Sequence, residues 1–237
     1  MLAELVAPMP VPDFLAEVWG NGYRLFEGAA GRFADLLAWP ALNEILRHHR
    51  LEPPRLRLSL DGQMVPADTY TTPVRLRRGG TYPRLRMGAL TEHLRNGATL
   101  VLDAVDELHD PIDALAGGLE QELREHVQVN AYGSWGSTHG FDLHWDDHDV
   151  LVIQVAGRKR WQIWGPTRRW PLFRDIEPNT TSPEKPLTEF MLTDGDVLSV
   201  PRGWWHIATA VDEPSLHLTA GITQDTGIDL LTWWVDE

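Results

Sequence analysis

Two histidines and one aspartate have the types and spacing to hold a metal ion. His144 and Asp146 stand two residues apart in the string FDLHWDDHDV, and His206 follows sixty residues after Asp146 in GDVLSVPRGWWHIA. Residues i and i+2 of a β-strand point to the same face, so a strand here would make His144 and Asp146 converge. An antiparallel barrel would bring the distant His206 beside them. Two histidines and one carboxylate leave metal positions open, as in non-haem Fe(II) oxygenases.

Other readings of these residues stay open at this point. An HxD string also arises by chance, and a surface histidine beside acidic residues is usually solvated. His148 forms an i, i+4 pair with His144, which on a helix would suit zinc, but the VLVIQV run that follows is typical of a strand. The chain has no cysteine, which excludes disulfides, zinc ribbons, iron–sulfur clusters and thiol nucleophiles. Any metal must therefore be held by histidine and carboxylate.

Composition indicates an ordinary folded protein. The 237 residues are 43% hydrophobic and 23% charged, which is typical of a globular chain, and the length allows one large domain. No run approaches the ~18 apolar residues of a membrane span, and the start lacks the pattern of a secretory signal, so we expect a cytoplasmic protein. The 21 basic and 34 acidic residues give a net charge of −13. This argues against a broad nucleic-acid-binding surface and favours a basic or neutral partner.

The elements that must position these side chains begin with a helical lead-in. Residues 1 to about 50 have helical spacing, in which Asp13 can cap the helix FLAEVW. Apolar residues between Phe33 and Leu46 continue the helical period, which Pro40 breaks. We therefore expect short helices packed on a later core.

The middle of the chain mixes strand and helix patterns. Residues 56–60 alternate leucine with polar residues, and Asp61-Gly62 supplies a turn. Residues 65–88 lack a clear period and are expected to be loop or edge structure. Residues 99–105 indicate a buried strand, and residues 111–126 an amphipathic helix.

From residue 127 to residue 225 the pattern becomes one of short strands separated by Gly, Pro, Asn and Asp, which is typical of a barrel or sandwich. The strand strings are VQVNAY, VLVIQVAG, KRWQIW, DVLSVPRG and SLHLTAGI. No repeat or linker divides the chain. We expect a single domain over residues 1–237, with a helix and strand lead-in at 1–98, a barrel core at 99–225 and the start of a C-terminal element at 226–237.

The motifs together resemble a known family. The stretch NAYGSWGSTHGFDLHWDDHDVLVIQVAGRKRWQIW, then GDVLSVPRGWWHIA and SLHLTAGITQ, is similar to the JmjC-type ribosomal oxygenases, which are Fe(II)- and 2-oxoglutarate-dependent protein hydroxylases of the cupin superfamily. The resemblance is strong from about 127 to 224. It implies a mainly β fold, a double-stranded β-helix (cupin or jelly-roll) barrel with an N-terminal helical lead-in. It also implies that His144, Asp146 and His206 are the iron ligands.

The resemblance assigns a co-substrate role to one of only two lysines in the chain. Lys159, in GRKRW, falls where the family places the basic residue that pairs with the distal carboxylate of 2-oxoglutarate. Elementary electrostatics agrees, because a dicarboxylate buried in a barrel needs a paired charge. Strand alternation would put Lys159, Trp161 and Ile163 on one face. The alternative is a solvated lysine in a turn.

Further residues resemble those that line the co-substrate end of the family's pocket. Asn130 and Tyr132 lie in NAY and Thr219 in HLTAG. Alternation places His217 on the same face as Thr219, so that imidazole is a candidate as well. A buried Asn or Tyr is as often a structural hydrogen bonder, and this alternative stays open for each of them.

The implied activity is hydroxylation of a side chain of a protein or peptide, such as a ribosomal protein, with Fe(II), 2-oxoglutarate and O₂. Alternatives are the same chemistry on a small metabolite or biosynthetic peptide, N-methyl demethylation, or a non-enzymatic metal-binding cupin. The last predicts loss of a ligand or of the lysine, and all four positions are filled. Family members continue into a dimerisation region and a winged-helix-like domain, whereas this chain ends soon after Trp233 and Trp234. We expect a compact member or a missing tail, and a possible homodimer.

Overall fold

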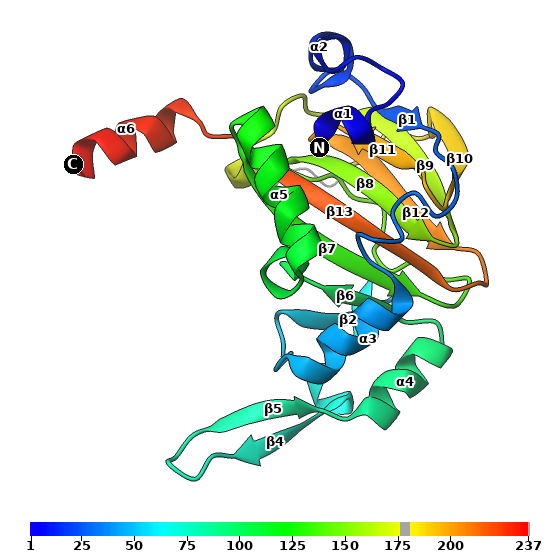
Figure 1. Cartoon of the computed structure of the whole chain (residues 1–237), viewed down its shortest axis with the longest axis vertical. Helices are drawn as coiled ribbons and strands as arrows, with labels where there is room; N and C mark the ends of the chain where they lie inside the picture. The colour runs from blue at the N-terminus through cyan, green and yellow to red at the C-terminus, as the bar shows by residue number, and fades with distance from the viewer. Residues whose placement is uncertain (176–180, 237) are drawn as a thin grey trace.

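The computed structural model describes residues 1–175 and 181–236, and their fold is mainly β (Figure 1). The predicted double-stranded β-helix is confirmed: one large antiparallel sheet and one small antiparallel sheet form its two layers. The strands of the large sheet, in spatial order, are β1 (Arg24–Phe26), β11 (Val197–Val200), β8 (Asp149–Ala156), β13 (Ser215–Thr223), β7 (His126–Ser134), β6 (Thr99–Leu102), β2 (Leu56–Leu60) and β3 (Gln63–Met64).

The small sheet has the order β10 (Thr188–Thr193), β9 (Arg158–Pro166) and β12 (Trp204–Ala210). From β8 onwards the chain crosses between the two sheets: β9 and β10 belong to the small sheet, β11 to the large, β12 to the small and β13 to the large. Apolar side chains of both sheets, among them Val152 on β8 and Ile163 on β9, pack into one cluster. The two sheets therefore face each other.

Strand alternation gives the large sheet two different faces. Val129 and Ala131 on β7 belong to the main apolar core, whereas Asn130 and Tyr132 on the same strand point into the space between the sheets. Helix α5 (Asp110–Leu123) covers the core face, where it buries Ile112, Leu115, Ala116 and Leu119. The face toward the small sheet is left for the candidate site.

The other helices are short and lie mostly in the lead-in. They are α1 (Leu2–Leu5), α2 (Val11–Asp13), the π-helical turn η1 (Phe14–Val18), α3 (Trp39–His48), α4 (Met87–Arg95) and α6 (Gly227–Asp236), with 3-10 turns η2 (Ala67–Thr69), η3 (Val105–Leu108) and η4 (Phe173–Asp175). No helix within residues 1–175 and 181–236 has the length and apolar character needed to cross a membrane.

The lead-in corrects two sequence expectations. Asp13 does not cap the helix FLAEVW, because helix α2 already begins at Val11 and the Asp13 side chain makes no capping hydrogen bond. Pro40 does not break a helix either. It lies in the first turn of α3, where the missing N–H of proline has no partner to lose.

Residues 65–88 contain more regular structure than the sequence indicates. Strands β4 (Thr71–Arg75) and β5 (Thr81–Leu85) form a two-stranded hairpin that extends from the lower end of the molecule in Figure 1. The predicted strand at 56–60 is confirmed as β2, and the predicted strand at 99–105 is confirmed but ends at Leu102. Residue 237, the last of the expected C-terminal element, lies outside the described residues.

Candidate active site

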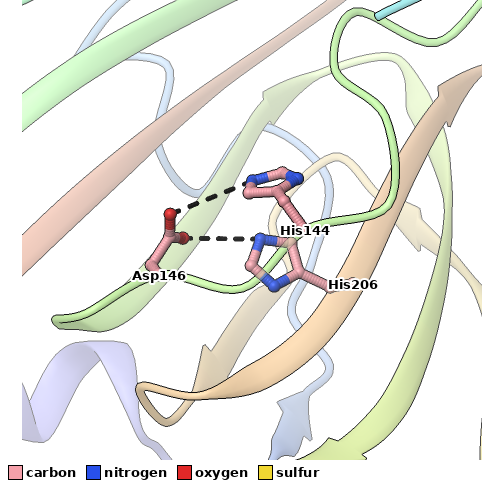
Figure 2. A group of neighbouring side chains, drawn as sticks. All are labelled: His144, Asp146 and His206. Carbon is pink, nitrogen blue, oxygen red and sulfur yellow. Dashed lines mark ion pairs between the residues drawn. The ribbon is translucent and has the colours of Figure 1, made fainter. Parts of the chain in front are cut away.

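His144, Asp146 and His206 come together between the two sheets, and Figure 2 shows them facing one another. One potential ligand atom from each lies within 4.8 Å of the others. The Asp146 carboxylate oxygens lie 3.9 Å from Nε2 of His144 and 3.5 Å from Nε2 of His206. The structure thus assembles the predicted triad from a segment before β8 and from strand β12.

The way in which the triad is positioned differs from the sequence expectation. His144 and Asp146 do not lie in a strand. The segment between β7 and β8 is irregular, and one antiparallel bridge joins His144 to His206 on β12. In that bridge the His206 N–H donates to the His144 carbonyl at 2.8 Å, and the His144 N–H donates back at 3.2 Å. Backbone pairing between His144 and His206 therefore brings the triad together, in place of the strand alternation that the sequence predicts.

Both imidazoles are oriented by the backbone. Nδ1 of His144 lies 2.7 Å from the carbonyl oxygen of Asp142, and Nδ1 of His206 lies 3.0 Å from that of Trp204. A nitrogen that faces a carbonyl oxygen must carry the proton and donate it. Nε2 of each ring is then the free lone pair, and it points toward Asp146. This is the tautomer that a metal-ligating histidine needs.

The charge state of the triad also suits a metal. Burial raises the pKa of Asp146, but the charges of His144, His206 and His148 outweigh burial and hold that pKa below its usual value. Burial, helped by the charge of His144, lowers the pKa of His206 to about 4. At neutral pH the site presents a carboxylate and a neutral imidazole, the deprotonated forms that bind a cation.

A cavity of about 310 Å³ adjoins the triad. Every predicted co-substrate residue lines it: Lys159, Asn130, Tyr132 and Thr219, and the additional candidate His217. Cross-strand register brings them together, because Thr219 pairs with Asn130 and His217 with Tyr132 across β13 and β7. Lys159 approaches from β9 in the opposite sheet.

Lys159 is the unusual residue of this cavity. Its side chain is buried, with Trp161 and Ile163 buried on the same face of β9. The ammonium makes no hydrogen bond or ion pair with any residue in the described ranges, and burial lowers its pKa to about 8. An unpaired buried cation is costly. A dianionic ligand with one end toward the triad and the other at Lys159 would supply the missing charge.

The wall beside Lys159 is aromatic. The rings of Tyr132 and His217 stack at 4.8 Å between centroids and 5° between planes, and Trp161 meets His217 edge-on. Burial and the charge of Lys159 hold the pKa of His217 well below its usual value, so its ring is neutral. Within the described part of the chain, Nδ1 of His217 and Nε1 of Trp161 are buried and have no hydrogen-bond partner. The cavity therefore offers polar atoms that a ligand could satisfy.

Asn130 and Tyr132 interact with each other and differ in their other partners. The Asn130 amide oxygen accepts hydrogen bonds from the backbone N–H of Ala104 and from the side chain of Gln128. Asn130 is therefore also a structural hydrogen-bonding residue. Burial and nearby carboxylates raise the pKa of Tyr132. Its hydroxyl stays protonated and can act as a hydrogen-bond donor in the cavity.

Some residues near the triad are not among the sequence candidates. Arg57 lines the cavity and forms a two-pronged ion pair with Asp103 at 2.8 and 2.7 Å. Its only sequence signal is its place in the alternating strand at 56–60. His148, first considered as a zinc ligand on a helix, instead pairs with Asp147 at 2.9 Å, and it is not part of the triad.

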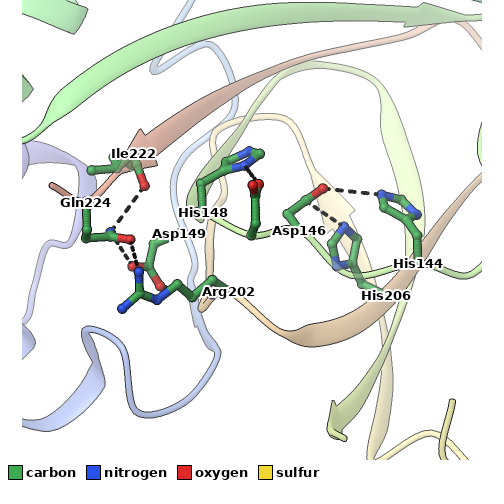
Figure 3. A network of polar contacts seen from close by, with 9 residues as sticks. His144, Asp146, His148, Asp149, Arg202, His206, Ile222 and Gln224 are labelled. Atoms are coloured by element: carbon green, nitrogen blue, oxygen red, sulfur yellow. Dashed lines mark hydrogen bonds and ion pairs between the residues drawn. The ribbon is translucent and has the colours of Figure 1, made fainter. Parts of the chain in front are cut away.

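The Asp149 carboxylate connects chain segments that lie next to the triad. Its carboxylate accepts the backbone N–H of Arg202 at 2.9 Å and the side-chain amide of Gln224 (Figure 3). Arg202 in turn donates to Gln224 at 2.8 Å. This network ties the start of β8 to the turn before β12 and to the end of β13. It fixes the two segments that carry the triad relative to each other.

Comparison with known proteins identifies the family. The profile of the JmjC domain family matches residues 108–230, more than half of the chain. The chain belongs to the JmjC domain family. The matched part of this JmjC chain contains the triad, Lys159 and the other cavity residues of β7 and β13.

Relatives of this JmjC chain are considerably longer. The bifunctional lysine-specific demethylase and histidyl-hydroxylase NO66 of Drosophila pseudoobscura pseudoobscura is 28% identical, over 94% of this chain and 23% of its own length. Ribosomal oxygenase 1 of Gallus gallus is 26% identical, over 93% of this chain and 36% of its own length. This chain thus spans about a quarter to a third of the curated relatives it matches.

Solved structures share the fold. Escherichia coli ribosomal oxygenase YcfD superimposes with a TM-score of 0.63 and 20% identity, over 96% of this chain and 55% of YcfD. YcfD in complex with cobalt and 2-oxoglutarate gives a TM-score of 0.63 and 18% identity, over 97% of this chain and 55% of YcfD.

Proposed function

We propose that this chain is an Fe(II)- and 2-oxoglutarate-dependent dioxygenase that hydroxylates a side chain of a protein or peptide. The observation that carries the proposal is one cavity with the triad at its wall and, across from it, the Lys159 ammonium, which has no partner in the described part of the chain. Membership of the JmjC family supports it. So do the printed names of the relatives, which are a histidyl-hydroxylase and a ribosomal oxygenase.

The residues present fit the metal. Nε2 of His144, Nε2 of His206 and a carboxylate oxygen of Asp146 would hold Fe(II), which suits a two-histidine, one-carboxylate set. Bound iron would supply, with 2-oxoglutarate and O₂, the oxidising power to break an unactivated C–H bond. The chain's own part is to keep the ligand nitrogens unprotonated, through the Asp142 and Trp204 carbonyls, and to keep Asp146 ionised.

The residues present also fit the co-substrate. The Lys159 ammonium would pair with the distal carboxylate of 2-oxoglutarate, and the hydroxyls of Tyr132 and Thr219 would donate hydrogen bonds to it. Asn130 would hold this end of the cavity in shape through its bond to Ala104. The stacked rings of Tyr132 and His217 would exclude water from the pair.

We further propose a ribosomal protein as substrate, because the relatives include ribosomal oxygenases. The net charge of −13 favours encounter with a basic segment. N-methyl demethylation is the second candidate, since one relative is named a lysine-specific demethylase as well. It would use the same site and differ only in the group presented to it. Such a substrate accords with a cytoplasmic location, which is part of the proposal.

A homodimer and a single JmjC unit over residues 1–237 complete the proposal. Helix α6 projects away from the barrel (Figure 1), and all six of its apolar side chains are exposed. They are Ile228, Leu230, Leu231, Trp233, Trp234 and Val235. Burial of this face between two copies would remove a large apolar surface from water. Light scattering on the purified chain would detect it as a doubled mass.

The proposed activity is tested with protein loaded anaerobically with Fe(II). Conversion of 2-oxoglutarate to succinate is expected, slowly even without substrate, together with a gain of 16 Da on a ribosomal protein. Release of formaldehyde from a methyl-lysine peptide would instead favour demethylation. Failure of the wild-type chain to bind or decarboxylate 2-oxoglutarate would reject the oxygenase proposal as a whole.

A further inference from the structure

The β4–β5 hairpin carries a concentrated positive charge on an acidic protein. We call residues 71–86 the basic arm. It contains five arginines, and residues 69–91 contain no acidic residue and no other basic one. Without those five, the chain has 16 basic and 34 acidic residues and a net charge of −18. The arginines of the basic arm are Arg75, Arg77, Arg78, Arg84 and Arg86.

Four of these guanidinium groups are free to bind a partner. Arg75, Arg77, Arg78 and Arg84 are exposed, and none of them has a hydrogen bond or ion pair to any residue within 1–175 or 181–236. Arg86 is different, since it donates to backbone carbonyls at Asp68 and Thr69 and so anchors the base of the arm. The basic arm holds its charges apart without neutralising them.

The arm is an ordered ribbon and not a loose loop. Its strands pair from Thr71 with Leu85 to Arg75 with Thr81, and the Leu76 N–H closes the tip on the Gly80 carbonyl at 3.0 Å. Gly80 has a φ of +86°, a backbone angle that residues with a side chain rarely adopt. Near the tip end of the strands, where Tyr82 pairs with Val74, the guanidinium of Arg50 from outside the arm stacks 3.8 Å over the ring of Tyr82.

Ribbon geometry spreads the arginines around the arm. Arg84 pairs with Thr72 and shares its face, whereas Arg75 lies three residues on and points to the opposite face. Arg77 and Arg78 occupy the tip between the strands. Positive charge therefore surrounds the ribbon, which suits entry between two rows of anions better than contact with one flat surface.

The arginines at the tip of the arm lie away from most of the acidic body (Figure 1). A five-residue strand spans ~17 Å at about 3.3 Å per residue, and charges are screened beyond roughly 8 Å at physiological salt. In Figure 1 the hairpin extends beyond the rest of the chain. The net charge of −13 argues against a broad nucleic-acid-binding surface, but it does not describe the potential at the tip of this arm.

We propose that the basic arm binds structured RNA through contacts of its guanidinium groups with backbone phosphates. Arginine binds phosphate in a two-pronged, planar geometry, and RNA helices are recognised largely by their shape and through phosphate and 2′-OH contacts. Protein interfaces instead need an apolar or aromatic centre, and beyond its arginines the exposed surface of the arm is mostly Thr, Gly and Pro. The choice of RNA rests on the proposed function, because RNA surrounds a ribosomal-protein substrate.

The test measures binding of a fluorescein-labelled 20-base-pair RNA hairpin by anisotropy, with the full chain. One variant combines Arg75→Gln, Arg77→Gln and Arg78→Gln. The matched control combines Arg124→Gln, Arg160→Gln and Arg169→Gln, which changes the net charge equally at exposed arginines outside the arm. The arm variant should raise Kd at least tenfold and flatten the slope of log Kd against log salt by about 2, since each phosphate contact contributes about 0.7 to 0.9. The control should change Kd less than twofold.

Three results would overturn the proposal: no binding by the wild type at 50 mM salt, equal binding by the arm variant, or tighter binding of a poly-glutamate peptide than of the RNA. The last would assign the arm to acidic proteins. Uncoupled turnover of 2-oxoglutarate is measured in parallel and should be equal in all three proteins, because no arm residue lines the cavity. Loss of turnover in every protein would reject the proposed function, while the RNA data would still decide the arm.

Discussion

Lys159 is a buried cation whose burial lowers the stability of the folded chain. Its ammonium is buried and has no partner among residues 1–175 and 181–236, and burial lowers its pKa from 10.5 to about 8. The unfolded chain therefore binds a proton more tightly than the folded chain. The buried ammonium therefore lowers the free energy of unfolding below pH 8, and this loss disappears as the pH rises from 8 to 10.5. We infer that a ligand which pairs with the Lys159 ammonium removes this cost in the ligand-bound protein.

Replacement of Lys159 by methionine should separate these two effects. We expect Lys159→Met to raise the dissociation constant for 2-oxoglutarate about a hundredfold, because a charge-assisted bond is lost. The ligand-free variant should be more stable than wild type at pH 7, by up to about 3 kcal/mol at about 1.4 kcal/mol per pKa unit, and the difference should vanish near pH 10.5. Calorimetry and thermal melts at both pH values measure this.

The control is Lys185→Met, which changes the only other lysine, an exposed one. It should alter neither 2-oxoglutarate affinity nor the melting temperature. If Lys159→Met binds 2-oxoglutarate as the wild type does, Lys159 has no part in co-substrate binding.

Asp146 is expected to dominate metal affinity. Asp146→Asn keeps the shape of the side chain but removes the charge that faces both Nε2 atoms, so binding of Co(II) as a stand-in for iron should weaken at least a hundredfold by titration calorimetry. Asp147→Asn is the matched control, because the neighbouring carboxylate pairs with His148 instead. Equal loss in both variants would show that general negative charge, and not ligation, holds the metal.

At the scale of elements, the turn between β8 and β9 determines where Lys159 lies. Gly157 has a φ of +66°, and a Cβ there would lie 2.0 Å from the Pro214 carbonyl oxygen. We expect Gly157→Ala to lower the melting temperature by at least about 5 °C, at roughly 2 to 4 °C per kcal/mol for a chain of this size. Affinity for 2-oxoglutarate should fall more than affinity for metal, since β9 carries Lys159.

Gly165→Ala on the same strand is the control, because its Cβ would only touch Leu187 at 3.6 Å. It should melt within about 1 °C of the wild type. A Gly157→Ala protein with wild-type stability would mean that the turn tolerates a side chain and does not fix β9.

The elements that the sequence predicts well are those with a local signal. The alternation in residues 56–60 becomes β2, and the amphipathic pattern at 111–126 becomes α5, which ends at Leu123 because Arg124 adopts a left-handed φ of 62°. Strands β10 and β12 and the β4–β5 hairpin lack such a signal. Strands β10 and β12 are ordered by pairing with β9, which is long-range information. Strands β4 and β5 pair with each other across residues 76–80, a local contact between strands that lack a clear apolar period.

The same distinction applies to the site. Residue types and motifs indicate His144, Asp146, His206 and Lys159, and all four meet at one cavity. The expected mechanism of convergence was wrong for His144 and Asp146, because an isolated bridge to β12 depends on a strand that the sequence does not reveal. Arg57 was missed because its partner, Asp103, lies far along the chain.

At the scale of the whole molecule, charge is distributed unevenly. The chain outside the basic arm has a net charge of −18, and the arm has five arginines. On a ribosomal particle, the arm would be drawn to RNA phosphates while the acidic body would attract basic protein segments. The two attractions would act on different components of the proposed target and would orient the protein on it.

This charge distribution predicts that salt weakens the capture of a basic substrate and leaves the chemical step almost unchanged. For a basic peptide that gains 16 Da, kcat/KM should fall several-fold between 50 and 500 mM NaCl, because screening weakens its steering toward the acidic body. Uncoupled 2-oxoglutarate turnover should change much less, since Lys159 is buried and poorly screened. A peptide with the same target residue but glutamine in place of its flanking lysines should lose most of the salt effect. An equal salt effect on both peptides would place its origin in the active site instead.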